Sequence, residues 1–415
     1  MRRRPAATLL GLMSVAAIGA APTPGVSQEV KPPRLTVTAV ANGATTIVTG
    51  VSFPDPVHGF AVAADNSFFT TADGGQTWAA GRTPVPAVDV ANLRTGSEGF
   101  GGFTDVDFTD PDRGHVVSLG DTVIATSDGG RSWVVQPTPR PSQVPVPWPL
   151  GVPTGWAFNA VSFVDREHGF VVGSPGVILA TADGGTTWRY QGNPDYDRLT
   201  DVAFVDADHG HIVGKVTGPD DQTYLALATV DGGSHWTPQR SGRPDDSNVP
   251  VNFDAVAVTD PRHAVVAGSN GRIFVTFDGG KTWRNRRSGT EERLNSVAFA
   301  DRRRGLAVGE INFQGELRAQ ILATNDGGQT WFPRPTPEAA SLSEVAFADR
   351  TTAYVVGCAT AVGSCKQGAI LNVDFPELEE EIEQPTSSAF SPIPLVLLGV
   401  ALLIAGGGIV LARRR

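Results

Sequence analysis

The stretch TADGGTTW at residues 181–188 recurs along the chain and decides its fold. Five copies read T-x-D-G-G-x-[TS]-W, and a sixth has His235 in the hydroxyl position. Their aspartates lie 47 to 55 residues apart, a period typical of one supersecondary unit per repeat. We call these copies boxes, and their aspartates and tryptophans are Asp73 and Trp78, Asp128 and Trp133, Asp183 and Trp188, Asp231 and Trp236, Asp278 and Trp283, and Asp326 and Trp331.

Each box ends a longer unit that reads as four short strands. In residues 158–188 an alternating apolar run ends in Asp165, a turn ending in His168 and Gly169 follows, and two further runs flank the box. Asp-Gly between two strands is a strong hairpin signal, because its turn needs positive φ angles. Four antiparallel strands form one propeller blade. The first-turn aspartate occurs seven times, so the sequence predicts an all-β, seven-bladed β-propeller over residues 34–375.

The seventh unit lacks a box. Residues 368–374 read as its third strand, and the chain then turns acidic. Residues 34–40 alternate, precede the first unit and have no partner of their own. We therefore expect them to supply the fourth strand of blade 7, which closes the ring and covers two exposed sheet edges.

The box residues have structural roles in this interpretation. The aspartate accepts backbone N–H bonds within the turn, the glycines adopt left-handed geometry, and the tryptophan buries apolar surface between neighbouring blades. Six of the eight tryptophans occupy this one position. A residue type repeated around a ring at one structural position indicates scaffold, so the sequence predicts no catalytic residue there.

The N-terminal residues 1–21 have the features of a secretory signal peptide. Arg2 to Arg4 precede a short apolar run, and Gly19-Ala20-Ala21 offers a small-residue cleavage site. An uncleaved N-terminal anchor is the alternative. Either reading places the propeller outside the cytoplasm.

The C-terminal end predicts a membrane anchor. Residues 393–412 are uncharged and mostly apolar, long enough for a transmembrane helix, and residues 413–415 are arginines that favour the cytoplasmic side. Residues 376–392 are acidic, with Pro and Ser, and read as an extended stalk. We expect a single-pass protein of the cell membrane with an extracytoplasmic propeller. A processed sorting tail is the alternative.

Cysteine and histidine content argues against a metal or cofactor site. Cys358 and Cys365 lie between two strand-like runs, which predicts a disulfide at the end of a hairpin in an oxidising compartment. Four histidines occupy the same turn position in different blades, so they do not converge on one ion. We expect each to bond its own turn aspartate: His58, His168, His209 and His263.

The charge balance excludes nucleic acid as a partner. The net charge is −10, and it is −16 without the six terminal arginines. Such a surface repels phosphate backbones.

Arginines and a proline-rich linker provide the candidate interface residues. Arg286 and Arg287 begin an outer strand after Trp283, Arg293 lies in the following linker, and residues 302–304 are arginines in a turn on the box side. Guanidinium groups on an otherwise acidic domain bind carboxylates of a partner. A solvated surface is the alternative. Trp148 in the linker 136–154 forms, with Trp156, a second candidate binding edge unless that linker packs down on the propeller.

The boxes resemble the Asp-box (BNR) repeats of sialidases and sortilin-like receptors. The longer unit, as in FNAVSFVDREHGFVVG at 158–173, looks most like the photosystem II stability/assembly factor family. The resemblance implies a non-enzymatic extracytoplasmic propeller that binds a membrane-protein or envelope partner, with arginine-rich patches as its interface. A sialidase-like hydrolase or a glycan-binding propeller is the alternative. No FRIP-like segment precedes the first box, and the chain has only four tyrosines.

Overall fold

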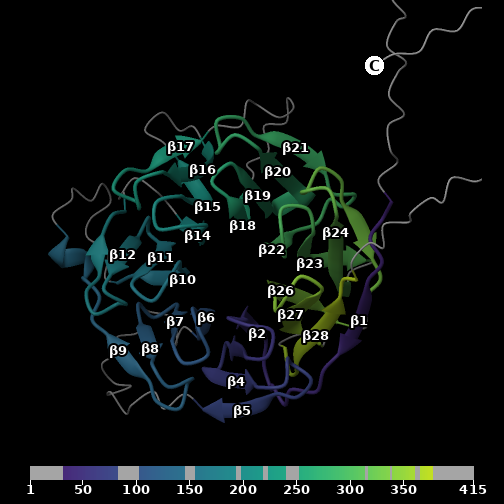
Figure 1. The fold of residues 1–415 in the computed structure, drawn as a ribbon, viewed down its shortest axis with the longest axis horizontal. Helices are drawn as coiled ribbons and strands as arrows, with labels where there is room; N and C mark the ends of the chain where they lie inside the picture. Colours follow the sequence, from purple (N-terminus) through teal and green to yellow (C-terminus); the bar gives the residue numbers. More distant parts are fainter. Residues whose placement is uncertain are drawn as a thin grey trace, which may run out of the picture. The chain divides into compact units, whose positions relative to one another are not determined.

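A computed structural model describes nine segments of the chain, which form one ring of seven antiparallel sheets (Figure 1). Every sheet has four strands, so the prediction of a seven-bladed, all-β propeller is confirmed. The described residues are 31–82, 102–144, 155–192, 198–217, 223–239, 252–313, 316–336, 339–359 and 365–376.

The first six blades each take four consecutive strands, numbered from the centre of the ring outward. Blades 1 to 3 consist of β2 (Val48–Ser52), β3 (Gly59–Ala63), β4 (Ser67–Thr71), β5 (Ala79–Arg82), β6 (Phe103–Phe108), β7 (Gly114–Ser118), β8 (Val123–Thr126), β9 (Val134–Gln136), β10 (Ala157–Phe163), β11 (His168–Ser174), β12 (Ile178–Ala182) and β13 (Arg189–Tyr190). Blades 4 to 6 consist of β14 (Arg198–Phe204), β15 (Gly210–Thr217), β16 (Thr223–Thr229), β17 (Thr237–Gln239), β18 (Phe253–Asp260), β19 (His263–Gly268), β20 (Arg272–Thr276), β21 (Arg284–Arg287), β22 (Leu294–Phe299), β23 (Gly305–Phe313), β24 (Glu316–Thr324) and β25 (Phe332–Arg334). Two short 3-10 turns, η1 (Pro141–Gln143) and η2 (Ser269–Gly271), lie in connections.

Blade 7 joins the two ends of the propeller. Its strands β26 (Ser341–Phe347), β27 (Thr352–Cys358) and β28 (Gly368–Asp374) are followed on the outside by β1 (Thr36–Ala39). Strand β1 pairs antiparallel with β28, from Thr36 opposite Asp374 to Ala39 opposite Leu371. Figure 1 shows β1, in purple, lying along β28 at the end of the colour scale. The expected closure by residues 34–40 is therefore present.

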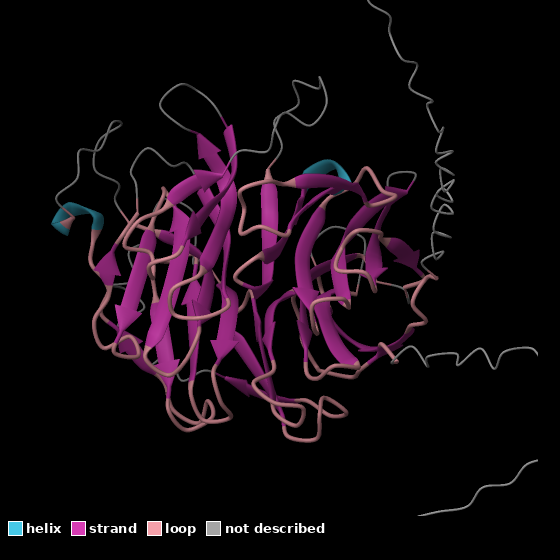
Figure 2. Ribbon diagram, turned by 45° about the horizontal axis from the view of Figure 1, so that its top comes forward, coloured by secondary structure: helices cyan, strands magenta, loops and turns pink. Residues whose placement is uncertain are grey.

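The connections divide the ring into two faces, and Figure 2 shows the ring obliquely. The first turn and the box of each blade meet on one side, which we call the box face. In blade 1 the Gly74 N–H of the box donates to the Val57 carbonyl of the first turn at 2.8 Å. Second-to-third-strand loops and the linkers between blades lie on the opposite side, the linker face.

The box turns have the predicted hydrogen bonds. In blade 1, Asp73 accepts the Thr77 N–H at 2.9 Å, the Thr77 hydroxyl at 2.6 Å and the Thr71 hydroxyl at 2.7 Å. These bonds, led by those from Thr77, lower the pKa of Asp73 to about 2. Gly74 and Gly75 have φ angles of 68° and 82°, which only glycine adopts without strain. Asp128, Asp183, Asp278 and Asp326 accept the same set of bonds, and at Asp231 the ring Nδ1 of His235 takes the place of the second hydroxyl of the box.

The box tryptophans pack between blades, as expected. Trp133 meets Phe108 of its own blade at 6.2 Å and Phe68 of the preceding blade at 5.0 Å, edge to face in both cases. Trp78 contacts Tyr354 of blade 7 in the same manner. Five of the six box tryptophans are 4 to 8% exposed, and Trp236 is partly buried. Their edge-to-face pairs add to the area term of each interface.

Innermost strands are joined by side chains that accept backbone N–H groups of the next blade. Asp105 and Asp107 of β6 bond to Val161 and Phe163, Asp201 of β14 bonds to Val256, and Glu344 of β26 bonds to Val51. Burial raises the pKa of Asp107 to about 6 and that of Asp201 to about 7, although these N–H bonds act in the other direction. The pKa of Glu344 is also raised, first by burial of its carboxyl group and then by the charge of Asp105.

The segments predicted to direct the chain to a membrane lie outside the described residues: 1–21, 377–392, 393–412 and 413–415. Within the part that the structure describes, no helix has the length and apolar character needed to cross a bilayer.

Candidate functional site

The position three residues after the box tryptophan is Gly81 in blade 1 and separates the other five boxed blades into two groups. Blades 2 to 4 have Gln136, Gln191 and Gln239 there, whereas blades 5 and 6 have Arg286 and Arg334. Gln136 shows what a glutamine does at this position. Its amide donates to the Gly184 carbonyl at 3.0 Å and accepts the Trp188 indole N–H at 3.2 Å, so it ties one blade to the next box.

Arg286 cannot take this role, because a guanidinium has no acceptor atom. The Trp331 indole N–H donates instead to its own Gly328 carbonyl at 2.9 Å. Arg286 is half-buried, and its Nε is enclosed without a hydrogen-bond partner among the described residues. A buried donor in this state is costly, and each such case calls for an explanation.

A groove of about 590 Å³ lies beside Arg286. It runs between the outer strand of blade 5 and the box of blade 6, and it is lined by Asn285, Arg286, Arg287, Gln329, Thr330, Trp331 and Phe332. Arg287 is exposed on the same strand. The groove therefore combines two guanidiniums with an amide, a hydroxyl and an aromatic ring, which suits a carboxylate attached to an apolar segment.

Arg334 occupies the same position in blade 6 and also has enclosed donors. Its Nε and Nη2 are enclosed without partners among the described residues, and its guanidinium lies 5.7 Å from the Phe332 ring centre. Burial lowers the pKa of Arg334, although an arginine stays charged at neutral pH. Arg334 is not among the interface residues predicted from the sequence. Aligning the residue three positions after each box tryptophan would have found it.

Arg293 is placed apart from Arg286 and Arg287. It binds Asp254 on the innermost strand of blade 5 through two bonds, at 2.6 and 3.0 Å, and the bonds to Asp254 raise its pKa. Four-stranded blades are about 14 Å from first to last strand. Arg293 therefore contacts the neighbouring blade near the innermost strands, and it does not line the groove beside Arg286 and Arg287.

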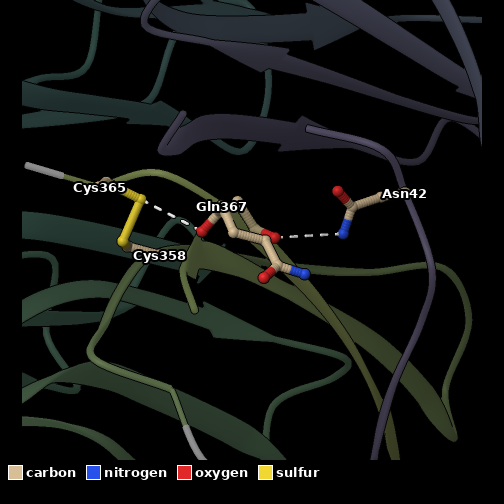
Figure 3. Close-up of a disulfide and its surroundings, with 5 residues drawn as sticks. Asn42, Cys358, Cys365 and Gln367 are labelled. Atoms are coloured by element: carbon tan, nitrogen blue, oxygen red, sulfur yellow. Dashed lines mark hydrogen bonds between the residues drawn. A yellow bond between two sulfur atoms is a disulfide. The ribbon is translucent and has the colours of Figure 1, made fainter. Parts of the chain in front are cut away.

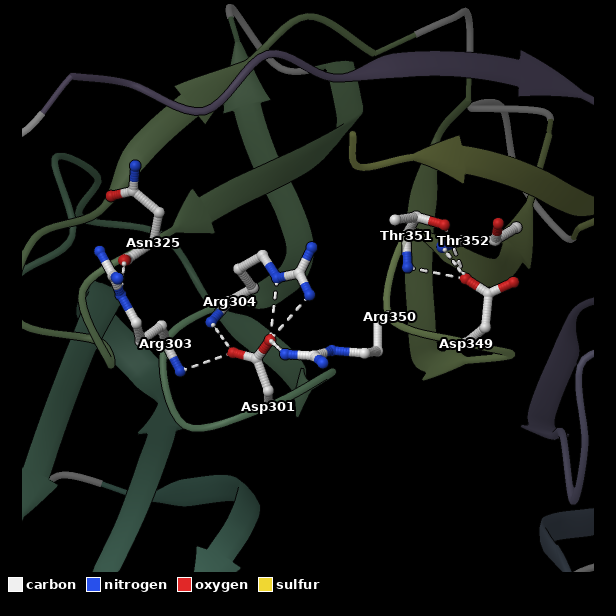
Figure 4. A network of polar contacts seen from close by, with 8 residues as sticks. All are labelled: Asp301, Arg303, Arg304, Asn325, Asp349, Arg350, Thr351 and Thr352. Atoms are coloured by element: carbon white, nitrogen blue, oxygen red, sulfur yellow. Dashed lines mark hydrogen bonds and ion pairs between the residues drawn. The ribbon is translucent and has the colours of Figure 1, made fainter. Parts of the chain in front are cut away.

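The arginines of residues 302–304 lie on the box face, and Figure 4 shows Arg303, Arg304 and Arg350 of blade 7 around Asp301. Arg304 and Arg350 both bond to Asp301, and Arg302 binds Asp260 of blade 5 at 2.9 Å. Burial acts to raise the pKa of Asp301, but the bonds from Arg304 and Arg303 outweigh it and lower the value to about 2. These arginines hold neighbouring turns together.

Two expectations about side-chain position are wrong. Trp156 is 4% exposed, with its indole N–H bonded to the Pro139 carbonyl at 2.8 Å, so it forms no exposed edge. Trp148 lies outside the described residues. His58, His168 and His209 bond their own turn aspartates as predicted, but His263 is buried and bonds Thr259 and the Gly327 carbonyl. Its aspartate, Asp260, is engaged by Arg302 instead.

A disulfide links Cys358 to Cys365 at the end of the β27–β28 hairpin (Figure 3). On the neighbouring N-terminal segment, Asn42 donates to the Gly368 carbonyl at 3.4 Å. The bond thus lies where the strands from both chain ends meet. Among the described residues, no three His, Cys, Asp or Glu side chains are grouped to hold a metal ion.

Comparisons with known proteins confirm the resemblance inferred from the repeats. Residues 89–190 and 247–332 match the family model described as photosynthesis system II assembly factor YCF48. Over 125 residues the chain is 33% identical to the photosystem II assembly lipoprotein Ycf48 of Synechococcus sp. (strain CC9902), which covers 30% of this chain and 34% of that protein. Over 201 residues it is 24% identical to the chloroplastic photosystem II stability/assembly factor HCF136 of Oryza sativa subsp. japonica, 46% of each.

The chain thus spans about a third to a half of the length of these curated relatives. Among solved structures, YCF48 bound to D1 peptide is similar with a TM-score of 0.57 and 16% identity, over 86% of this chain and all of that one. At this identity the likeness shows the fold. The chain is a β-propeller that resembles photosystem II assembly factors.

Proposed function

We propose that this chain is a non-enzymatic, membrane-anchored propeller that binds a protein partner outside the cytoplasm. The observation that carries the proposal is the groove between blades 5 and 6, which Arg286 and the exposed Arg287 line. A carboxylate from another protein would bind these two guanidinium groups. The similar structure of YCF48 bound to D1 peptide supports a peptide as the ligand.

The proposed location rests on sequence segments and on the disulfide. Residues 1–21 have the composition of an export signal, and residues 393–412 followed by three arginines have that of a membrane anchor. A structural disulfide fits an oxidising compartment. The anchor would hold the propeller close to membrane proteins, which we propose as the partner class.

Affinity capture tests the proposal. Full-length protein is crosslinked in its own membranes and purified, and captured proteins are identified. The deciding variant is Arg286→Gln, which introduces the residue that blades 2 to 4 already have at this position. We expect loss of a charge-assisted contact to lower capture of the specific partner about tenfold.

Arg189→Gln is the matched control, because Arg189 is an exposed arginine on the outer strand of blade 3. It should leave capture unchanged. Equal capture by the parent protein and Arg286→Gln would reject the groove as the interface. Recovery of only soluble cytoplasmic proteins would reject the proposed location.

A further inference from the structure

A second groove lies three blades away, between blades 2 and 3 on the box face. Its volume is about 620 Å³. Blade 2 contributes Arg113, His115, Val134 and Gln136, and blade 3 contributes Arg166 and Glu167, with Thr109, Ser127, Ser132 and Thr186 around them. Cavities of this size hold small ligands or a few residues of a peptide.

Arg113, like His263 of blade 5, does not bond the aspartate of its own first turn. His58, His168, His209 and Arg304 occupy the equivalent place, and each bonds the aspartate of its own first turn. The corresponding aspartate of blade 2, Asp110, accepts Arg166 of blade 3 at 2.7 Å. No side-chain bond of Arg113 is formed within the described residues, and its exposed guanidinium lines the groove.

His115 follows the first glycine of its strand, a position where blade 4 also has a histidine, His211. Blades 1 and 3 have Phe60 and Phe170 at this position, stacked on a phenylalanine of the following blade. His115 keeps the stack, 3.7 Å from Phe163, but it puts a polar ring on the groove wall. It is 6% exposed, its Nε2 lies 3.3 Å from the Gly184 carbonyl, and its Nδ1 has no partner among the described residues. Burial lowers its pKa to about 4, so the ring is neutral at pH 7.

The charges of the groove define the kind of ligand that fits. Arg113 and the free end of Arg166 attract a carboxylate, whereas Glu167 nearby repels a free anion and accepts an N–H. Val134 is 67% exposed at the outer side and offers an apolar contact. An acidic side chain on a peptide suits the two arginines, Glu167 and Val134 together. Its carboxylate meets the arginines, and the peptide backbone beside it supplies N–H groups for Glu167.

We propose that the groove between blades 2 and 3 is a separate peptide-binding site that takes a Glu or Asp side chain on an extended segment. The carboxylate binds Arg113 and Arg166, the segment's N–H groups meet Glu167, and its aliphatic part covers Val134. This site stands independently of the groove beside Arg286.

Fluorescence anisotropy tests this site with a defined probe. A fluorescein-labelled peptide of alternating Ala and Glu is titrated with detergent-solubilised full-length protein carrying Arg286→Gln, so that the other groove is weakened. We expect Arg113→His to raise the Kd about tenfold, whereas His115→Phe should leave it within twofold, because the buried His115 makes none of the proposed contacts. Both substitutions copy residues that other blades use at the same positions, which favours correct folding, and circular dichroism verifies it.

Arg131→His is the control, since Arg131 is exposed in blade 2 but bonds its own box at Asp128. It should leave the Kd within twofold of the parent. The proposal fails if Arg113→His also stays within twofold, if an Ala and Gln peptide binds as tightly, or if the acidic peptide does not bind. Retained binding in the Arg286→Gln background, with no partner captured in membranes, would reject the proposed function but keep this site.

Discussion

Blade 7 and the six boxed blades reach the same interblade packing with different residues. In five of the six boxed blades the tryptophan meets a phenylalanine at the end of the innermost strand, as Trp331 meets Phe299 at 6.1 Å, and blade 5 has Val258 at that position. Blade 7 has no box, and Phe375 takes that place, edge-on to Phe347 at 6.3 Å and fully buried. The Phe375 N–H donates to the Thr351 carbonyl, the bond that the first box glycine makes elsewhere.

The difference teaches what a box supplies beyond an aromatic ring. Asp374 stands where the box aspartate would be, but no hydrogen bond to its side chain is present within the described residues. A box connects a third strand to a fourth through a tight turn. Blade 7 needs no such turn, since its fourth strand, β1, comes from the other end of the chain. Blade 7 therefore keeps the aromatic contact but lacks the hydrogen-bonded turn of a box.

The largest expected effect comes from removing the aromatic contact in both settings. Trp188→Ala and Phe375→Ala each delete a buried ring, and we expect each to lower the free energy of unfolding by about 3–5 kcal/mol. Urea unfolding followed by fluorescence measures this. A loss below about 1 kcal/mol for Phe375→Ala would show that Phe375 is no substitute for the tryptophan.

The disulfide is specific to the closing blade, so its loss should act there. Replacing Cys358 and Cys365 together by alanine opens a short loop, and the loop-entropy relation gives a cost of about 2 kcal/mol. Hydrogen exchange should show faster opening of β28 and β1 and little change in blade 3. Uniform destabilisation around the ring would contradict a local role for the bond.

Carboxyl groups of the innermost strands should make stability depend on pH. Asp201 has a folded-state pKa of about 7, above its ordinary value, mainly because of burial and with Asp254 nearby. The folded state therefore holds a proton that the unfolded state has lost, so stability should rise as the pH falls from 8 to about 5. Asp201→Asn and Glu344→Gln should each flatten the profile of urea midpoints. A profile that falls over this range would contradict the assignment.

The smallest effect concerns the turn itself. Asp278→Asn keeps a side chain of the same shape but removes the charge that accepts the Thr282 N–H and hydroxyl. Bonds from Thr282 keep the Asp278 pKa below its ordinary value although burial opposes them, so its stabilisation is lost as the pH falls below 4. We expect Asp278→Asn to lower the melting temperature and Asp374→Asn to leave it unchanged. Equal shifts would mean that blade 7 has a working box after all.

The repeats predicted most of the fold because each copy repeats the same local chemistry. Comparing copies exposed the missing box and the spare strand at 34–40, so closure was predictable. Phe375 was not, since it lies beyond the last aligned strand. Three features depend on contacts with neighbouring blades: the unpaired Nε of Arg286, the bond of His263 to the Gly327 carbonyl, and the burial of Trp156. A single repeat does not encode those contacts.

Pairing of β1 with β28 has a consequence for the timing of assembly. Thr36 and its partner Asp374 lie at opposite ends of the propeller sequence. At about 5–20 residues per second, a ribosome needs tens of seconds to produce the second after the first. During that interval β1 has no partner and blade 1 has no neighbour on one side. The protein therefore needs protection from premature strand pairing until its last sheet emerges.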